Sequence, residues 1–126
     1  MIIIDTSVWI SAIRNPGSRD DLTLRGLIDA DEAGLALPVR IELLASTKAK
    51  NRKELRGALT ALPVVFPSDE TWAVVEHWVE TAAEQGERFG VSDLLIAALA
   101  DELGALVWSL DKDFERMEKL KFVRLM

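Results

Sequence analysis

The chain of 126 residues contains no cysteine and only one histidine, His77. Without cysteine, a protein has no disulfide framework, no thiolate zinc site and no thiol nucleophile. A single histidine also excludes metal-free RNA cleavage by two imidazoles that act as acid and base. Because His77 is remote in sequence from the acidic motifs, we expect it at the surface or at a dimer contact, and not at a metal.

Long apolar runs are also missing. The apolar start of the chain is interrupted by Asp5, so it is too short for a secretory signal, and no segment approaches the ~18 apolar residues of a membrane span. We therefore expect a cytoplasmic protein with no membrane partner. The composition, 49% apolar and 29% charged, is typical of a folded chain, and residues 1–126 are expected to form a single domain.

Positive charge is scarce. The chain has 15 basic and 21 acidic residues, which gives a net charge of −6. An acidic protein is by that measure a poor partner for nucleic acid. The position of the acidic residues therefore matters as much as their number.

Short apolar runs alternate with helical patterns along the whole chain. The runs predict strands at residues 2–4, 35–37, 63–67, 105–110 and 122–125. Between them, helical spacing predicts a helix from Asp20 to Gly34 and, with the cleanest 3.6-residue period, one from Val91 to Gly104. This alternation favours an α/β fold, a three-layer sandwich in which helices flank a central parallel sheet of about five strands.

Carboxylates follow the predicted strands or lie early in the helices behind them. They are Asp5, Glu42, Asp93, Asp111 and Asp113. Parallel sheets bind ligands beyond the carboxyl ends of their strands, so we expect the five to share one edge. Taken singly, each has a plainer interpretation as a helix cap, a charge on a helix dipole or a solvated residue. Together they would repel one another by several kcal/mol unless a cation held them.

Oxygen-only ligands select hard divalent cations, so the cofactor we expect is Mg²⁺ or Mn²⁺. Such a site makes hydroxide from bound water and neutralises charge on an attacked phosphate. The residues therefore favour metal-assisted hydrolysis of a phosphodiester. Without the five carboxylates the net charge would be −1, so most of the acidity lies where a divalent cation would reverse it.

Four sequence blocks contain these carboxylates. They are IIDTSVWI at 3–10, LP at 37–38 with ELL at 42–44, SDLLIAA at 92–98, and SLDKDF at 109–114. In this order and over the whole chain, they resemble the PIN-domain ribonucleases, and above all the VapC toxins of type II toxin–antitoxin pairs.

The resemblance implies a five-stranded parallel sheet and a Mg²⁺- or Mn²⁺-dependent endoribonuclease site. The acidic quartet that binds metal and activates water would be Asp5, Glu42, Asp93 and Asp111. Asp113 would be an accessory acid, and Thr6 would supply a hydroxyl that supports Asp5. Ser109 stands where the family commonly has threonine, and serine keeps the hydroxyl group. The resemblance also implies a homodimer and a small antitoxin protein whose tail blocks the active-site groove.

Two groups of basic residues could contact RNA phosphates. We favour the group containing Lys112 and Arg116, because Lys112 lies between two of the carboxylates. The group containing Lys48 and Arg52 is slightly better explained as a solvated helix face.

The four tryptophans fit core positions. Trp72 and Trp108 match apolar patterns most clearly. Trp9 and Trp78 are also better explained by core packing, although Trp9 could line a groove for the antitoxin tail and Trp78 could meet a partner.

Two other functions remain open. A phosphotransfer domain would use a strand-end aspartate as phosphoryl acceptor, but Ser7 stands where the haloacid-dehalogenase pattern needs a second aspartate. A PIN-fold interaction module without catalysis would be expected to have lost part of the acidic set, which is intact. Nucleotide binding is not indicated, because the chain has no glycine-rich phosphate loop.

Overall fold

Four strands form one parallel sheet at the centre of the molecule. The computed structural model describes all residues from 1 to 126. The strands are β1 (Ile2–Ile4), β2 (Ala33–Ala36), β3 (Val64–Val65) and β4 (Leu106–Trp108). Their order in the sheet is β3-β2-β1-β4, and every neighbouring pair is parallel. Parallel neighbours need a crossover connection, which explains why helices separate all the strands.

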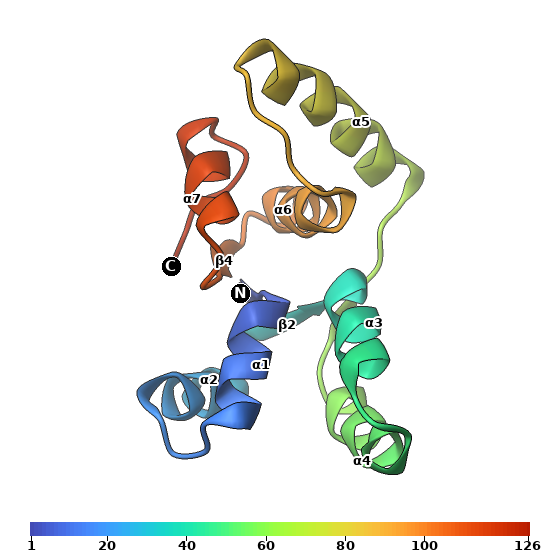
Figure 1. Cartoon of the computed structure of the whole chain (residues 1–126), viewed down its shortest axis with the longest axis vertical. Coiled ribbons are helices and arrows are strands. Elements are labelled where there is room, and N and C mark those ends of the chain that lie inside the picture. The colour runs from blue at the N-terminus through green and yellow to red at the C-terminus, as the bar shows by residue number, and fades with distance from the viewer.

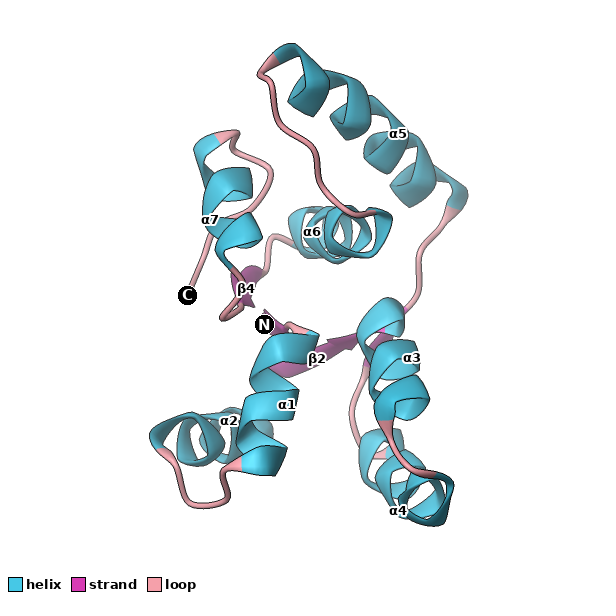
Figure 2. Ribbon diagram, viewed as in Figure 1, coloured by secondary structure: helices cyan, strands magenta, loops and turns pink.

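Seven helices cover the two faces of this sheet. They are α1 (Thr6–Arg14), α2 (Arg19–Asp29), α3 (Leu37–Ser46), α4 (Ala49–Thr60), α5 (Asp69–Glu84), α6 (Val91–Leu103) and α7 (Lys112–Lys119). In the view of Figures 1 and 2, α1, α2 and α4 lie below the sheet, α5 to α7 lie above it, and α3 stands beside its β2 end. The predicted α/β sandwich is confirmed. None of these helices combines the length and the apolar composition needed to cross a bilayer.

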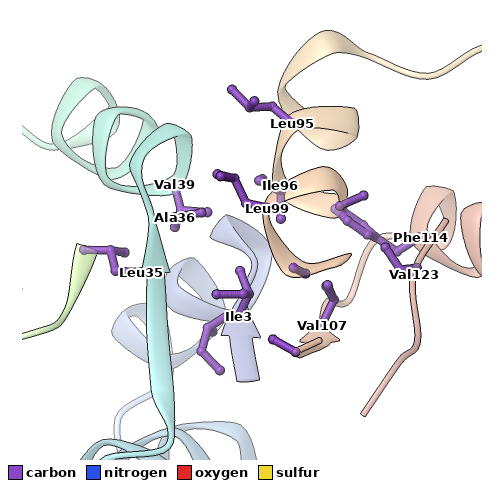
Figure 3. Close-up of a cluster of buried hydrophobic side chains, with 14 of the residues drawn as sticks. Ile3, Leu35, Ala36, Val39, Leu95, Ile96, Leu99, Val107, Phe114 and Val123 are labelled. Carbon is purple, nitrogen blue, oxygen red and sulfur yellow. The ribbon is translucent and has the colours of Figure 1, made fainter. Parts of the chain in front are cut away.

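Helix α6 is the central element of the upper layer. Every residue from Leu94 to Ala100 is buried, so no face of the helix is left to solvent over this stretch. Figure 3 shows Ile96 and Leu99 gathered with Ile3 and Val107 of the sheet, and all belong to one cluster of buried apolar side chains. The core therefore holds the start of α6 firmly against the strands.

The fifth predicted strand, at residues 122–125, is reduced to a single bridge between Val107 and Leu125. The bridge consists of two backbone hydrogen bonds of 2.9 Å, from Val107 N–H to the Arg124 carbonyl and from Met126 N–H to the Val107 carbonyl. The N–H of Leu125 points away from β4 and donates to the Glu118 carboxylate at 2.8 Å. The left-handed backbone of Lys121 (φ 64°) turns the chain just before this segment. The sheet accordingly has four strands where the sequence suggested about five.

The predicted extension of the second helix to Gly34 is wrong. Helix α2 ends at Asp29, and Asp31 turns the chain with a left-handed φ of 57°. Gly34 is instead a residue of β2, where an added Cβ would lie 2.8 Å from side-chain atoms of both Ile3 and Met1. This glycine marks a close packing point and not the end of a helix.

The expectation that Trp72 lies in the core is also wrong, because its exposed fraction is 46%. Helix α5 turns Val75 toward the core instead. Trp9 is buried, and Trp78 and Trp108 are half-buried against the core, as expected. An apolar residue next to a buried stripe can face solvent without a change in the helical pattern.

Candidate metal centre

Asp5 stands at the junction between β1 and α1 and caps that helix. Its exposed fraction is only 5%. Its Oδ2 atom accepts hydrogen bonds from the hydroxyls of Ser7 at 2.7 Å and Ser109 at 2.8 Å. A buried carboxylate needs such donors, and these two hold it in one orientation.

The same two hydroxyls join chain segments that are 102 positions apart. The backbone N–H of Leu110 donates to Ser7 Oγ at 3.0 Å, and that of Asp111 donates to Ser109 Oγ at 3.0 Å. The end of β1 is thereby tied to the segment that follows β4. Ser109 thus lies beside Asp5, where the sequence placed a supporting hydroxyl.

Thr6 does not make the predicted contact. Its Oγ1 atom is buried without a hydrogen-bond partner, and the hydroxyl beside Asp5 comes from Ser7. Sequence reasoning missed Ser7, although a signal was present. A capping side chain accepts a hydrogen bond from the backbone N–H of the residue two or three positions later, and Ser7 follows Asp5 by two positions.

Three carboxylates meet at the starts of two helices. Asp93 lies in the first turn of α6, Asp111 caps α7, and Asp113 lies in the first turn of α7. One oxygen atom from each lies within 4.8 Å of the other two. The positive ends of the two helix dipoles favour negative charge at these positions.

The pKa of Asp93 is affected by all the other carboxylates. Its partial burial raises its pKa from 3.8 to about 7, and the negative charges of Asp5, Asp111, Asp113 and Glu42 add to the effect in that order. Each of the other four carboxylates predicted from the sequence is thus close enough to Asp93 to disfavour its ionised form, and burial is the larger cause.

Glu42 reaches this group from α3. Ser92, the residue before Asp93, donates its hydroxyl hydrogen to Glu42 Oε1 at 2.5 Å. This bond connects α3 to the beginning of α6. Ser92 was not singled out from the sequence, and only its position next to Asp93 could have suggested a role.

The donor set fits a divalent cation. Every side chain in the cluster offers carboxylate oxygen, which is the ligand that Mg²⁺ and Mn²⁺ prefer. Burial and the neighbouring carboxylates raise the pKa of Asp93, and a bound divalent cation would oppose both effects. The oxygen atoms that lie within reach of one ion belong to Asp93, Asp111 and Asp113, so the structure adds the expected accessory acid to the group that would hold the ion. The predicted ligands Asp5 and Glu42 lie beside this group, and their direct binding of the ion stays a prediction.

The residues predicted to contact RNA differ in whether their side chains are already bound to other groups of the protein. Arg52 donates to the backbone carbonyls of Leu44 and Thr47, at 3.2 and 3.0 Å, and so closes the end of α3. Lys48 is exposed just before α4. Lys112 is exposed between Asp111 and the rest of α7 and makes no ion pair.

Arg116 is engaged with acidic residues. Its guanidinium donates to Asp113 Oδ1 at 2.8 Å and forms an ion pair with Glu87, in the segment before α6. The hydrogen bond to Asp113 raises the pKa of Arg116 above its usual value. His77 is exposed on α5, in agreement with the expected surface position.

The chain is similar to known proteins over nearly its full length. The model of the PIN domain family matches residues 2–120. A VapC ribonuclease of Mycobacterium bovis is 30% identical over 125 residues, which cover 95% of this chain and 93% of the relative. Ribonuclease VapC18 of Mycobacterium tuberculosis is 29% identical over 119 residues, covering 90% and 85%.

Solved structures show the same fold. A chain in VapBC2 from Rickettsia felis, bound to a promoter DNA fragment, aligns with a TM-score of 0.81 at 20% identity and covers 100% of this chain and 98% of that one. A chain in DNA-bound VapBC from Salmonella typhimurium aligns with a TM-score of 0.80 at 18% identity, covering 99% and 96%. The chain therefore belongs to the PIN-domain family, as a relative of the VapC ribonucleases.

Proposed function

We propose that this protein is an endoribonuclease that needs Mg²⁺ or Mn²⁺ and serves as the toxin of a type II toxin–antitoxin pair. The observation that carries the proposal is the meeting of five carboxylates around Asp93, whose pKa is raised to about 7. The ribonuclease relatives that match nearly the whole chain support the same activity.

The chain's own residues would bind the ion and handle the proton of the attacking water. A bound divalent cation would lower the pKa of that water and offset charge on the phosphodiester. Asp93, Asp111 and Asp113 would hold the cation, while Ser7 and Ser109 keep Asp5 in place. Glu42 Oε1 is occupied by Ser92, so Glu42 can accept the water proton at Oε2. The free Lys112 can contact an RNA phosphate.

A cleavage assay tests the proposal. The purified protein should degrade a mixed RNA panel with Mg²⁺ or Mn²⁺ and should stop when EDTA is added. Asp5→Asn should slow cleavage at least a hundred-fold without a change in the circular dichroism spectrum, because it removes a charge from the site. Asp101→Asn, an exposed position on α6, is the matched control and should cleave normally.

The alternatives give different results in the same assay. No cleavage of any RNA with either metal would favour an interaction module. Trapping of an aspartyl-phosphate would favour phosphotransfer. Against phosphotransfer stands the burial of Asp5, whose Oδ2 atom is already occupied by two hydroxyls.

The antitoxin partner is supported by a cleft between α1, α2 and α4. A cavity of about 510 Å³ is lined by eleven residues, nine of them apolar, so it suits an apolar peptide segment. Trp9 lies in this lining, and its buried Nε1–H has no acceptor. Similar solved chains come from VapBC and other toxin–antitoxin complexes. We propose that an antitoxin segment rests here while its tail reaches the active-site groove.

The partner can be tested with the product of the reading frame next to this one. That protein should block RNA cleavage by the wild type. Ala58→Arg should escape inhibition, because Ala58 lines the cleft and an arginine would fill it. Ala49→Arg, at the other end of α4 and outside the cleft, should remain inhibited. Equal inhibition of both variants would contradict this location.

A homodimer is the other partner we propose. Apolar side chains are exposed at Phe66, just before α5, and at Trp72 and Val79 on α5. Trp72 and Val79 are seven positions apart and therefore lie on the same side of the helix. An exposed apolar stripe of this kind is suited to a second copy of the chain.

A further inference from the structure

Three contacts hold the Arg116 side chain. Two are with residues outside α7, and the third is with a residue of the preceding turn of α7. One guanidinium nitrogen donates to Asp113 Oδ1 at 2.8 Å, and the other pairs with Glu87. The guanidinium carbon lies 4.7 Å from the ring centroid of Phe89. A planar guanidinium suits such a fork, because it can serve two carboxylates and an aromatic face at once.

The ring beneath Arg116 belongs to a larger aromatic group. Phe89 meets Phe122 edge to face at 6.4 Å, and Phe122 stacks on Trp78 at 4.4 Å with nearly parallel planes. These residues come from α5, from the segment before α6 and from the chain after α7. Arg116 therefore rests on a platform built by three separate parts of the chain, which limits its movement.

Asp113 needs such a partner. Its side chain is 39% exposed, and Arg116 is the only side chain that forms a hydrogen bond to it. Because the Asp111 carboxylate lies close by, like-charge repulsion would favour turning Asp113 outward into water. The bond from Arg116 to Oδ1 opposes that rotation and leaves Oδ2 free.

We propose that Arg116 is a positioning residue that holds Asp113 toward Asp93 and Asp111, so that a divalent cation meets a preassembled set of ligands. The inference rests on the metal-dependent site proposed above and gives Arg116 a role through Asp113 and not through RNA. Residues that orient metal ligands commonly change metal affinity ten- to a hundred-fold when they are replaced.

The direction of the effect separates this role from simple electrostatics. Removal of a positive charge near a cation site, by Coulomb's law alone, would strengthen cation binding. Loss of an oriented ligand would weaken it. A phosphate contact would leave cation binding without RNA unchanged and would raise only the KM for RNA.

The experiment is titration of the intact protein with Mn²⁺, without RNA, by calorimetry. We expect Arg116→Gln to bind Mn²⁺ about ten-fold more weakly than the wild type. Arg116→Lys keeps the charge but lacks the fork, so it should recover only part of the affinity. Lys119→Gln removes an exposed positive charge one turn later on α7 and should bind like the wild type.

A double-mutant cycle tests whether Arg116 affects Mn²⁺ binding through Asp113. If Arg116 acts through Asp113, then adding Arg116→Gln to Asp113→Asn should cause no further loss of Mn²⁺ affinity. Should Arg116→Gln fail to fold, Glu87→Asp shortens the side chain that anchors Arg116 but keeps its negative charge, and it should weaken Mn²⁺ binding by up to about ten-fold.

Three results would overturn the proposal. Unchanged or tighter Mn²⁺ binding by folded Arg116→Gln would exclude positioning, as would a full additional loss in the Asp113→Asn background. Absence of Mn²⁺ binding by the wild type would instead remove the metal site itself, and the proposal with it. The wild-type titration therefore distinguishes failure of the inference from failure of the proposed function.

Discussion

Asp93 is the residue at which burial and like charge act together. Its pKa of about 7 lies well above the 3.8 of the free side chain. Between these values the folded protein binds a proton that the unfolded chain releases, so the free energy of unfolding falls as the pH rises from about 4 to about 7. A bound cation would stabilise the ionised form of Asp93, so it would remove this loss of unfolding free energy.

Asp93→Asn should therefore stabilise the metal-free protein. At pH 8 we expect a gain of about 1 kcal/mol, after allowance for solvent screening of a half-exposed group, or about 4 °C in Tm. At pH 5 the gain should be only about a third as large, because Asp93 is then protonated in the folded state but already ionised in the unfolded chain, and it should vanish below about pH 4. Thermal melts in EDTA at both pH values measure this, and exposed Asp101→Asn is the control. An equal effect at pH 5 and pH 8 would contradict the raised pKa.

Ser109 offers a second test at the scale of single residues. Ser109→Ala removes one of two hydroxyl donors to Asp5 and the acceptor of the Asp111 N–H, so RNA cleavage should fall about ten-fold or more. Ser109→Thr keeps the hydroxyl and should retain activity near the wild-type level. Cleavage rates at saturating Mg²⁺ make the comparison. If the alanine and threonine variants cleave equally well, the hydroxyl has no supporting role.

At the scale of elements, four segments bring the five carboxylates together. Asp5 directly follows β1 and Glu42 lies on α3, while the other three aspartates lie at the starts of α6 and α7. The neighbouring strands β1 and β4 place the two strand ends side by side. Burial of α6 on all sides from Leu94 to Ala100 then holds the first turn that precedes this stretch. Strand β1 also pairs with β2, so the position of Asp5 depends on the packing of β1 against β2.

Gly34 tests that packing. Gly34→Ala would place a methyl group 2.8 Å from the fully buried Ile3 side chain, so we expect a loss of about 1–2 kcal/mol in unfolding free energy. Gly26→Ala on the exposed side of α2 meets nothing within 4 Å and should stabilise by about 0.5–1 kcal/mol. Urea unfolding of both variants gives the values. An unchanged unfolding free energy for Gly34→Ala would mean that the side chains of Ile3 and Met1 move aside at little cost.

At the scale of the whole molecule, the acidic charge is unevenly distributed. The net charge of −6 includes five carboxylates in one site, while Lys112 is exposed beside it and makes no ion pair. Exposed apolar side chains occur on several elements, and two of them, Trp72 and Val79, share one side of α5, the outermost helix of the upper layer (Figure 1). The proposed dimer surface is this side of α5.

Trp72→Glu should therefore produce a monomer. The glutamate would place a charge in the apolar stripe of α5, which is unfavourable in a buried contact between two copies. Light scattering coupled to size-exclusion chromatography should give twice the chain mass for the wild type and the single chain mass for the variant. Leu22→Glu, at an exposed apolar position on α2, is the control and should remain dimeric. A monomeric wild type would contradict the homodimer.

Much of the fold could be predicted, since it follows from local patterns. The run Ile2–Ile4 and the periodic helix after Gly90 are each encoded by neighbouring residues, and both are confirmed. The errors occur where distant contacts decide. The side chains of Ile3 and Met1 leave no room for a Cβ at Gly34, and the left-handed turn at Lys121 lets the chain meet β4 only at Leu125.

By itself, the sequence determined which residue types were available for chemistry and where they stand relative to strand ends and helix starts. The absence of cysteine and the single histidine left carboxylates, and the alternation of strands and helices placed them at one edge. Only the tertiary structure decided that Ser7, and not Thr6, holds Asp5, and that Arg116 pairs with Asp113 and Glu87. Such choices depend on distances between segments that are far apart in the chain, and no local pattern encodes them.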